Sequence, residues 1–175
     1  MPAVLLRSWR AGDALDIASM TEDEHIQRWS SMDHDVQGWI VRQRSGVRGP
    51  SRAICLPDDA RALGKVALRM PGHASPATTC EAIVADDAPV GELSYWLVPA
   101  ARGRGIASAA VEAMMELVAS TTDLRSVVLD VEVTNPASQG LARRVGAQRR
   151  EPERVELDRS GVPRRLAVFV LAVHG

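Results

Sequence analysis

Apolar side chains recur along the first half of the chain at the two spacings that distinguish strands from helices. Short apolar runs indicate strands, whereas apolar residues three and four positions apart, such as Val36, Trp39 and Ile40, share one face of a helix. The elements predicted in this half are a strand over 4–9, helical segments from Asp13 as N-cap, around 26–29 and over 36–44, and strands over 51–56 and 62–70. The Pro-, Gly- and Thr-containing segment 71–89 is predicted to be a loop, within which 80–85 could form an edge strand.

The second half begins with an alternation of strands and helices. A strand that ends near residue 98 leads into a helix from Ile106 to about residue 120, whose wide apolar face suits packing on a sheet. After a valine-rich strand over 126–133, a second helix is predicted to begin at Asn135 and to close at Gly146 as its C′ residue. The first strand and helix therefore form a βα unit.

The chain ends in two long strands, 148–157 and 164–173, which a turn over 158–163 joins into a hairpin. The last strand is apolar on both faces, so we expect it to lie inside the sheet rather than at its edge. No internal repeat, low-complexity tract or linker divides the 175 residues. One α/β domain over 1–175 is therefore predicted.

The composition is that of an ordinary globular protein and argues against several functional classes. Apolar residues make up 46% and charged residues 25% of the chain, which allows a compact core. The formal net charge of −1 provides no overall field toward nucleic acid or an anionic membrane, so we expect neither as a partner. The longest apolar run, 166–173, is far shorter than the ~20 residues of a membrane span. Without a secretory segment at the start, a cytoplasmic location is expected.

Cysteines and charges are distributed in ways that narrow the expectations further. Cys55 and Cys80 lie in no spacing typical of a metal or disulfide framework, so no metal is expected. The segment 13–35 carries seven acidic residues against one arginine, and 143–165 carries eight arginines against four acidic residues. One region could attract a cation and the other an anion, although solvated faces give the same imbalance.

The stretch 91–111 joins an apolar strand, a Pro turn and an Arg/Gly loop to a helix without a break. A helix begins with four backbone N–H groups that have no partner inside the helix, and its dipole places partial positive charge there. Gly103 and Gly105 remove the Cβ atoms that would hold a phosphate away from these groups, and Arg102 and Arg104 add positive charge beside them. The stretch therefore predicts a bound phosphate or pyrophosphate.

Other glycine-rich motifs fit this loop less well. It lacks the GxxxxGKS/T pattern of an NTPase P-loop, and it lacks the GxGxxG spacing with a downstream acidic residue of a dinucleotide-binding fold. Arg/Gly-rich nucleic-acid-binding arms are disordered and contain interleaved aromatics, whereas this loop opens directly into an apolar helix.

With the segments around it, the loop resembles that of GCN5-related N-acetyltransferases (GNAT), in particular the ribosomal-protein N-acetyltransferase (RimJ/RimL-like) branch. The segment Arg102-Gly-Arg-Gly-Ile-Ala107 fits the family's Q/R-x-x-G-x-G/A acetyl-CoA loop and follows a strand written Ser94-Tyr-Trp-Leu-Val98. The resemblance spans nearly the whole chain. The further matching positions are Asn135, Ser138, Leu141 and Gly146 and, more weakly, Leu6, Arg7, Trp9 and Asp13.

The resemblance implies a mixed, mostly antiparallel and strongly twisted sheet of about six or seven strands, splayed at its centre and flanked by about four helices. It also implies acetyl-CoA as cofactor. The backbone of Leu97 and Val98 would pair with the pantetheine arm, and Asn135 would hydrogen-bond that arm from the other side. Asn135 before Pro136 also fits a helix N-cap, and both roles can hold together. The residues expected around the pyrophosphate are Arg102, Gly103, Arg104, Gly105, Ile106 and Ala107.

Acetyl transfer to an amine needs a neutral amine, donors for the oxygen on which negative charge develops, and a proton for the departing thiolate. Glu92, at the start of the strand that would carry the thioester, is the candidate base. The alternatives are a solvent-facing Glu92 and a proton relay through water, because an α-amine has a pKa of about 8. Many members of the wider family place a tyrosine seven residues after the Asn, but here that residue is Ala142. The candidate acid is therefore Ser138, which could also be an ordinary helix-surface serine. Backbone N–H groups near Leu97 and Val98 would meet the oxygen.

The acidic first third of the chain suggests an acceptor that carries an amine. Trp29 and Trp39 fall in the helical region that forms the acceptor wall in the family, although tryptophans at helical spacing are also typical of a core. Tyr95 lies in the strand beside the thioester and is a further candidate substrate contact.

We predict an acetyl-CoA-dependent N-acetyltransferase that acts by direct attack in a ternary complex. Its acceptor would be a primary amine of a protein N-terminus or a small molecule, and it would be a monomer or homodimer. The alternative is a non-catalytic acyl-CoA-binding or sensing module on the same fold.

Overall fold

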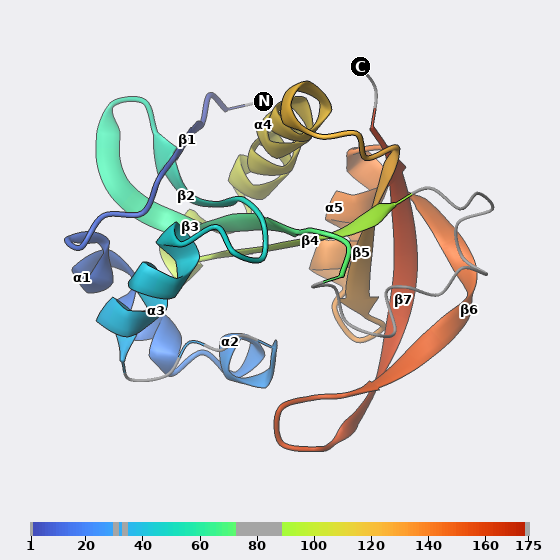
Figure 1. The fold of residues 1–175 in the computed structure, drawn as a ribbon. Coiled ribbons are helices and arrows are strands. Elements are labelled where there is room, and N and C mark those ends of the chain that lie inside the picture. Colours follow the sequence, from blue (N-terminus) through green and yellow to red (C-terminus); the bar gives the residue numbers. More distant parts are fainter. Residues whose placement is uncertain (1, 30–31, 33–34, 73–88, 174–175) are drawn as a thin grey trace.

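In the described part of the chain, seven strands form one sheet in the order β1-β2-β3-β4-β5-β7-β6 (Figure 1). The computed structural model describes residues 2–29, 32, 35–72 and 89–173. Neighbouring strands pair antiparallel except β4 and β5, which are parallel. The strands are β1 (Leu5–Arg7), β2 (Ser51–Leu56), β3 (Asp59–Arg69), β4 (Val90–Leu97), β5 (Ser126–Glu132), β6 (Gln148–Leu157) and β7 (Pro163–Ala172). The mixed, mostly antiparallel sheet expected from the sequence is thus confirmed.

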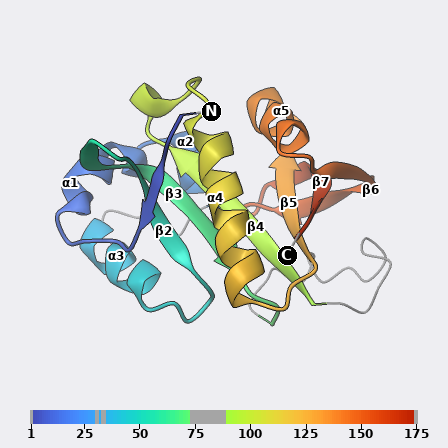
Figure 2. The same cartoon turned by 90° about the horizontal axis from the view of Figure 1, so that it is seen from above.

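Helices from the two halves of the chain cover opposite faces of this sheet. Those of the first third lie on one face, whereas α4 and α5 lie on the other (Figures 1 and 2). None of the described helices combines the length and apolar character needed to cross a bilayer. The α-helices are α1 (Asp13–Ile17), α2 (Glu24–Trp29), α3 (Val36–Arg44), α4 (Ile106–Thr121) and α5 (Pro136–Arg144), and the 3-10 turns are η1 (Ala18–Thr21) and η2 (Pro99–Ala101).

The larger core cluster fills the space between the sheet and helices α4 and α5. Along α4 its buried members recur every three or four residues, so the apolar face predicted for this helix is confirmed. On β7 the neighbouring residues Val168 and Phe169 are both fully buried, and they belong to clusters on opposite faces of the sheet. The last strand is therefore interior to the sheet, as its apolar pattern predicts. The α4 residues in this cluster are Ile106, Ala110, Val111, Met114 and Val118.

Three tryptophans form the centre of the second core cluster, on the face that carries α1 and α3. The rings of Trp9 and Trp39 meet edge to face, with centroids 5.0 Å apart. The ring of Trp96, from β4, lies 6.4 Å from Trp9 and 6.1 Å from Trp39. Such aromatic packing holds the N-terminal helices against the sheet.

Asp13 differs from its expected role as an N-cap. Gly12 occupies the cap position of α1 without a side-chain hydrogen bond. The carboxylate of Asp13 is buried and forms a bidentate pair with Arg7, at 2.6 and 2.8 Å, and it also accepts the N–H of Arg10 at 2.7 Å. A buried carboxylate requires such partners, and the partner comes from β1. The possible edge strand over 80–85 lies outside the described residues.

The sheet opens at its centre, between β4 and β5. The two strands pair only from Val90↔Ser126 to Glu92↔Val128. Beyond Glu92, β4 continues to Leu97 paired with β3 alone, and β5 continues to Glu132 paired with β7 alone. Figure 2 shows the two strands diverging from their common start. The central splay implied by the resemblance is therefore present. Among the strands that the structure describes, none pairs with the splay-facing backbone edge of β4 beyond Glu92.

Candidate functional site

The Arg/Gly loop connects the end of β4 to α4 at the open end of the splay. After η2, Arg102 is extended, and Gly103 and Gly105 have φ angles of 73° and 76°. Side chains other than glycine rarely adopt these left-handed angles, which explains both glycines. A Cβ atom on Gly103 would meet no atom within 4 Å. The loop is therefore open to a ligand on that side.

The first turn of α4 has backbone donors without partners inside the helix. Gly105 is its N-cap and provides no side-chain hydrogen bond. The first helical hydrogen bond runs from the N–H of Ala109 to the carbonyl of Gly105, at 3.1 Å. The N–H groups of Ile106, Ala107 and Ser108 therefore precede the hydrogen-bonded helix. With the helix dipole behind them, they form a site for an anion.

The two arginines of the loop have different environments. Arg102 donates through Nε to the carbonyl of Leu97 at 2.9 Å and through Nη2 to Asp23 at 2.7 Å. Its side chain therefore ties the loop to the end of β4 and to the segment that precedes α2. Arg104 is exposed beside the helix N-terminus. A bound anion would meet the charge of Arg104 more directly than that of Arg102.

The edge of β4 that faces the splay offers one of the two backbone donors named from the sequence. The N–H of Val98 donates to the carbonyl of Leu63 on β3, at 2.8 Å, so it is already used within the sheet. Successive residues of a strand direct their backbone groups to opposite edges. The N–H of Leu97 therefore points toward the splay.

Ser138 and Asn135 lie at the start of α5, across the splay from β4. The Asn135 side chain accepts the N–H of Ser138 at 3.0 Å, so the N-cap role of Asn135 is present in the structure. The hydroxyl of Tyr95 lies 2.6 Å from Ser138 Oγ. Tyr95 packs with the α4 and α5 cluster, so it faces away from the tryptophan core.

Glu92 and Asp130 lie on the other face of the sheet, one on each side of the splay. Glu92 alternates with Leu93, which packs under α4, and Asp130 alternates with Leu129 and Val131 of the same cluster. Glu92 forms an ion pair with Arg69 at 2.9 Å, and Asp130 forms one with Arg154 at 2.9 Å. Burial, together with the negative charges of Glu92 and Glu156, raises the pKa of Asp130 to about 6 against the opposing effect of Arg154.

Asp130 is a candidate site residue that the sequence reasoning missed. The available signal was a carboxylate inside the apolar strand that follows α4. Lys65 on β3 was missed as well. Burial and the nearby Arg69 lower the pKa of Lys65 to about 8, and its Nζ lies 5.8 Å from the ring centroid of Trp39. Ionisable groups with shifted pKa values around a cleft are typical of functional sites.

Of the two tryptophans expected at the acceptor wall, one lies in the core. Trp39 is fully buried against Trp9, so it presents no surface to an acceptor. Trp29 is 37% exposed, and its indole N–H donates to Glu132 at the end of β5. Arg28 also contacts Glu132, at 3.1 Å. Helix α2 thus begins next to Asp23, which pairs with Arg102, and ends beside Glu132 at the end of β5.

Substituting Glu132 by Gln is expected to destabilise the fold by about 1–3 kcal/mol at neutral pH, because three hydrogen-bond donors, Arg28, Trp29 and Thr134, lose a buried carboxylate. Burial alone would raise the pKa of Glu132, but hydrogen bonds from Trp29 and Arg28 outweigh it and lower the pKa. The wild-type carboxylate therefore stabilises the fold above the unfolded-state pKa, and this contribution is lost as the pH falls through the folded-state pKa.

Denaturant unfolding of the E132Q variant at two pH values, one neutral and one acidic, measures this effect. The difference from wild type should shrink at acidic pH. Glu116→Gln, at an exposed position on α4, is the matched control and should change the unfolding free energy little at either pH. An equal difference at both pH values would contradict the role assigned to the Glu132 charge.

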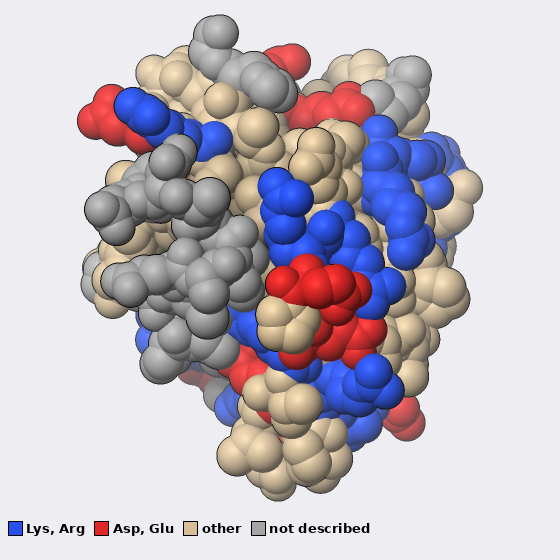
Figure 3. All heavy atoms as spheres, turned by 90° about the vertical axis from the view of Figure 1, so that its right-hand side faces the viewer, with Lys and Arg blue, Asp and Glu red and all other residues tan. Residues whose placement is uncertain are grey.

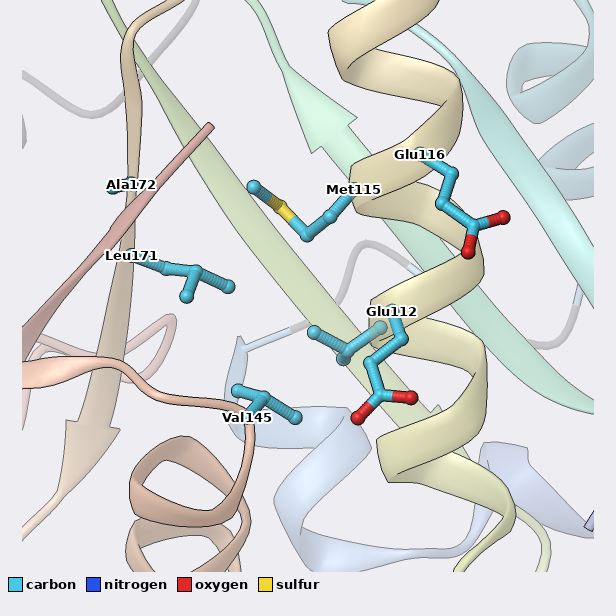
Figure 4. Close-up of a pocket in the computed structure, with 7 residues that line it drawn as sticks. Glu112, Met115, Glu116, Val145, Leu171 and Ala172 are labelled. Atoms are coloured by element: carbon cyan, nitrogen blue, oxygen red, sulfur yellow. The ribbon is translucent and has the colours of Figure 1, made fainter. Parts of the chain in front are cut away.

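A cavity of about 340 Å³ lies between α4 and β7, toward the end of the sheet where β4 and β5 are still paired. Its walls are mainly apolar: Met115 points from α4 toward Leu171, while Glu116 points away from β7 (Figure 4). Glu112 and Glu116 border this cavity. Two carboxylates at the border disfavour phosphate there, so the N-terminus of α4 remains the better anion site.

The arginines of the last third surround carboxylates on the face formed by β6 and β7 (Figure 3). Glu153 pairs with Arg149 and, at 2.6 Å, with Arg165, and Arg149 lies 3.2 Å from Glu151. The local excess of arginine seen in the sequence is therefore partly neutralised by neighbouring acidic residues. This supports the solvated-face alternative for that segment.

Comparison with known proteins gives one family and a set of similar folds. Residues 3–148 match the family model described as acetyltransferase (GNAT) domain. No match is found among curated proteins.

Several solved structures resemble nearly the whole chain at low sequence identity. Spermidine N-acetyltransferase from Vibrio cholerae, in complex with CoA and spermine, has a TM-score of 0.72 and 15% identity, with 97% of this chain and 95% of that chain covered. Ribosomal-protein-S5-alanine acetyltransferase from Vibrio fischeri has a TM-score of 0.71 and 15% identity over 99% and 94%. Microcin C7 self-immunity acetyltransferase, in complex with acetyl-CoA and AMP, has a TM-score of 0.73 and 14% identity over 97% and 92%.

Proposed function

Because the chain belongs to the acetyltransferase (GNAT) family, we propose that it transfers an acetyl group from acetyl-CoA to a primary amine by direct attack in a ternary complex. The observation that carries the proposal is the placement of two kinds of group on opposite faces of one splay. Anion-binding and proton-donating groups lie on the face of α4 and α5. Two carboxylates, Glu92 and Asp130, lie on the other face, where an amine could be held.

The residues at the α4 N-terminus fit the pyrophosphate of acetyl-CoA. The free N–H groups of the first turn and the exposed Arg104 are anion donors, and the glycine at 103 leaves the approach open. The unpaired edge of β4 would bind the pantetheine arm through Leu97, and Asn135 would contact that arm from α5. Acetyl-CoA supplies the acetyl group as a thioester, the form from which an amine can displace a thiolate.

On the amine side, Asp130 and Glu92 would hold the acceptor nitrogen and take its proton. An acid with a pKa of about 6 is ionised at neutral pH and remains basic enough to accept a proton. The carboxylate of Glu92 forms an ion pair with Arg69 at 2.9 Å and would attract a cationic amine electrostatically. We therefore assign the proton transfer to Asp130 and the electrostatic attraction to Glu92.

On the thioester side, the N–H of Leu97 would donate to the oxygen that becomes negative, and Ser138 would give a proton to the departing sulfur. A backbone N–H that faces the splay is fixed before the reaction begins, so it stabilises the developing charge without reorganisation. Ser138 is held by the α5 cap, which fixes its backbone to Asn135.

The acceptor is proposed as a protein N-terminus or a small-molecule amine. Structural neighbours include an enzyme named for spermidine and one named for a ribosomal-protein alanine, so the fold serves both classes. The exposed Trp29 on α2, at the end of β5, would form part of the acceptor wall.

Added CoA is expected to raise the thermal midpoint of the protein, because a ligand that binds only the folded state stabilises it. Release of CoA from acetyl-CoA should then follow addition of an acceptor from a panel of N-terminal peptides and small amines. Absence of a thermal shift would contradict the cofactor assignment. A thermal shift without turnover on any acceptor would favour the non-catalytic acyl-CoA-binding module.

A further inference from the structure

Tyr95, the chain's only tyrosine, meets Ser138 across the splay. The two residues belong to β4 and α5 and are 43 positions apart, yet their side-chain oxygens lie 2.6 Å from each other. The Tyr95 hydroxyl also lies 3.4 Å from the backbone carbonyl oxygen of Ser138. Either side-chain oxygen can donate in this pair, so the contact can pass a proton from Tyr95 to Ser138.

The surroundings of Tyr95 include a positive charge that a tyrosinate would need. Burial raises the pKa of Tyr95, whereas the hydrogen bond with Ser138 and the charge of Arg144 act in the opposite direction. Arg144 lies on α5 above Gly140, where its Nη1 would be 3.3 Å from an added Cβ. Arg144 is on the same helix as Ser138, about 1.7 turns further along it.

We infer that Tyr95 is a positioning residue that supplies, through Ser138, the proton taken up by the departing CoA thiolate. The inference rests on the proposed function. As the S–H bond forms, the O–H bond of Ser138 breaks, and the O–H bond of Tyr95 breaks as that of Ser138 re-forms. The tyrosinate left beside Arg144 then takes a proton from water.

The chemistry explains why a serine alone would be a poor acid here. An aliphatic hydroxyl gives up its proton far less readily than a thiol, whereas a phenol has a reference pKa of about 10 against about 8.5 for a thiol. Burial raises the pKa of Tyr95 above this reference, but the phenol remains a far stronger acid than a serine hydroxyl. A proton that starts on Tyr95 therefore reaches the sulfur at a much smaller cost than one taken from Ser138 with no replacement. The phenol of Tyr95 would thus supply the proton for the CoA thiolate, although Ala142 occupies the position where the family usually has a tyrosine.

Steady-state kinetics on the full-length protein test the relay. Tyr95→Phe is expected to lower kcat about tenfold with little change in the KM for acetyl-CoA, which is less than the roughly hundredfold effect of removing a group that transfers the proton directly. Because the proton of Tyr95 would pass through Ser138, the double variant Y95F/S138A should have the same kcat as S138A alone. Ser120→Ala, which removes an exposed hydroxyl from α4, is the control. Additive losses in the double variant, or a changed KM with unchanged kcat, would overturn the inference.

A second measurement needs no turnover. Because the chain has one tyrosine, the ultraviolet absorbance of tyrosinate during a pH titration reports Tyr95 alone. S138A and Arg144→Gln should each raise the titration midpoint, since both partners lower the pKa of Tyr95. Unchanged midpoints would overturn the coupling on which the relay depends. A wild-type protein that acetylates no amine would contradict the proposed function instead, and the titration would still decide whether Tyr95 and Ser138 are coupled.

Discussion

Replacing Gly103 by Asp is expected to weaken CoA binding about a hundredfold while the protein remains folded. The new carboxylate would stand beside the free N–H groups of α4, where the pyrophosphate is proposed to bind. Two like charges about 4 Å apart near a protein surface repel by roughly 4 kcal/mol, and a hundredfold change in Kd corresponds to about 2.7 kcal/mol. Calorimetric titration with CoA measures the affinity directly.

Backbone strain is the competing explanation, and the chain offers a matched control for it. Gly103 has a φ of 73°, and a side chain in this region costs roughly 1–2 kcal/mol. Gly161, in the turn between β6 and β7, has a φ of 81°, and a Cβ there would likewise meet no atom within 4 Å. Gly161→Asp should therefore lose a similar amount of stability and keep its affinity for CoA. Equal affinities in the two variants would refute the anion site at this loop.

This loop could be predicted from the sequence because its function is encoded locally. The two glycines, the arginines and the apolar helix after them are contiguous, and backbone N–H groups at a helix start need no distant partner. The same holds for β7, whose apolar residues on both faces require cover on both sides wherever the strand lies. Both predictions depend on hydrophobic periodicity and on turn residues that lie within a single segment of the sequence.

Contacts between distant segments could not be predicted in this way. Helical spacing left Trp39 as either core or acceptor wall, and its burial is decided by Trp9 and Trp96, which come from other elements. Tyr95 and Ser138 were both named as candidates, but for separate roles, because nothing local indicates that β4 and α5 approach each other. The fate of the Val98 N–H depends likewise on Leu63 of the neighbouring strand.

The role of Asp130, the proposed general base, also depends on contacts with distant segments and therefore could not be predicted from β5 alone. The alternation along β5 indicates that Asp130 and Glu132 share a face, but not what that face meets. Glu132 meets α2, through Arg28 and Trp29, and so becomes part of the fold. Asp130 lies beside the splay, where β4 has diverged and the charge of Glu92 still reaches it. Two carboxylates of one strand thus differ in role because Glu132 is held by residues of α2, whereas Asp130 pairs with Arg154 of β6 beside the splay.

Substituting Asp130 by Asn is expected to lower kcat/KM roughly a thousandfold, within the range found when a general base is removed. The acidic limb of the wild-type pH profile, with an apparent pKa near the value of about 6 raised by burial, should disappear in the variant. Glu156→Gln is the matched control, because Glu156 also approaches Arg154, at 3.8 Å, and it should retain most of the activity.

The D130N variant should also be more stable than wild type above about pH 6. This expected gain in stability distinguishes a catalytic role of Asp130 from a structural one. Because the pKa of Asp130 is raised in the folded state, the folded protein binds a proton more tightly than the unfolded chain, and stability falls as the pH rises from about 4 to about 6. An uncharged Asn avoids this cost, so the unfolding free energy at neutral pH should rise by roughly 1–3 kcal/mol. Denaturant unfolding of D130N beside wild type measures it. A variant that lost activity and stability together would show that Asp130 is a partner for Arg154 first, and the proton transfer would then have to pass to Glu92 or to water.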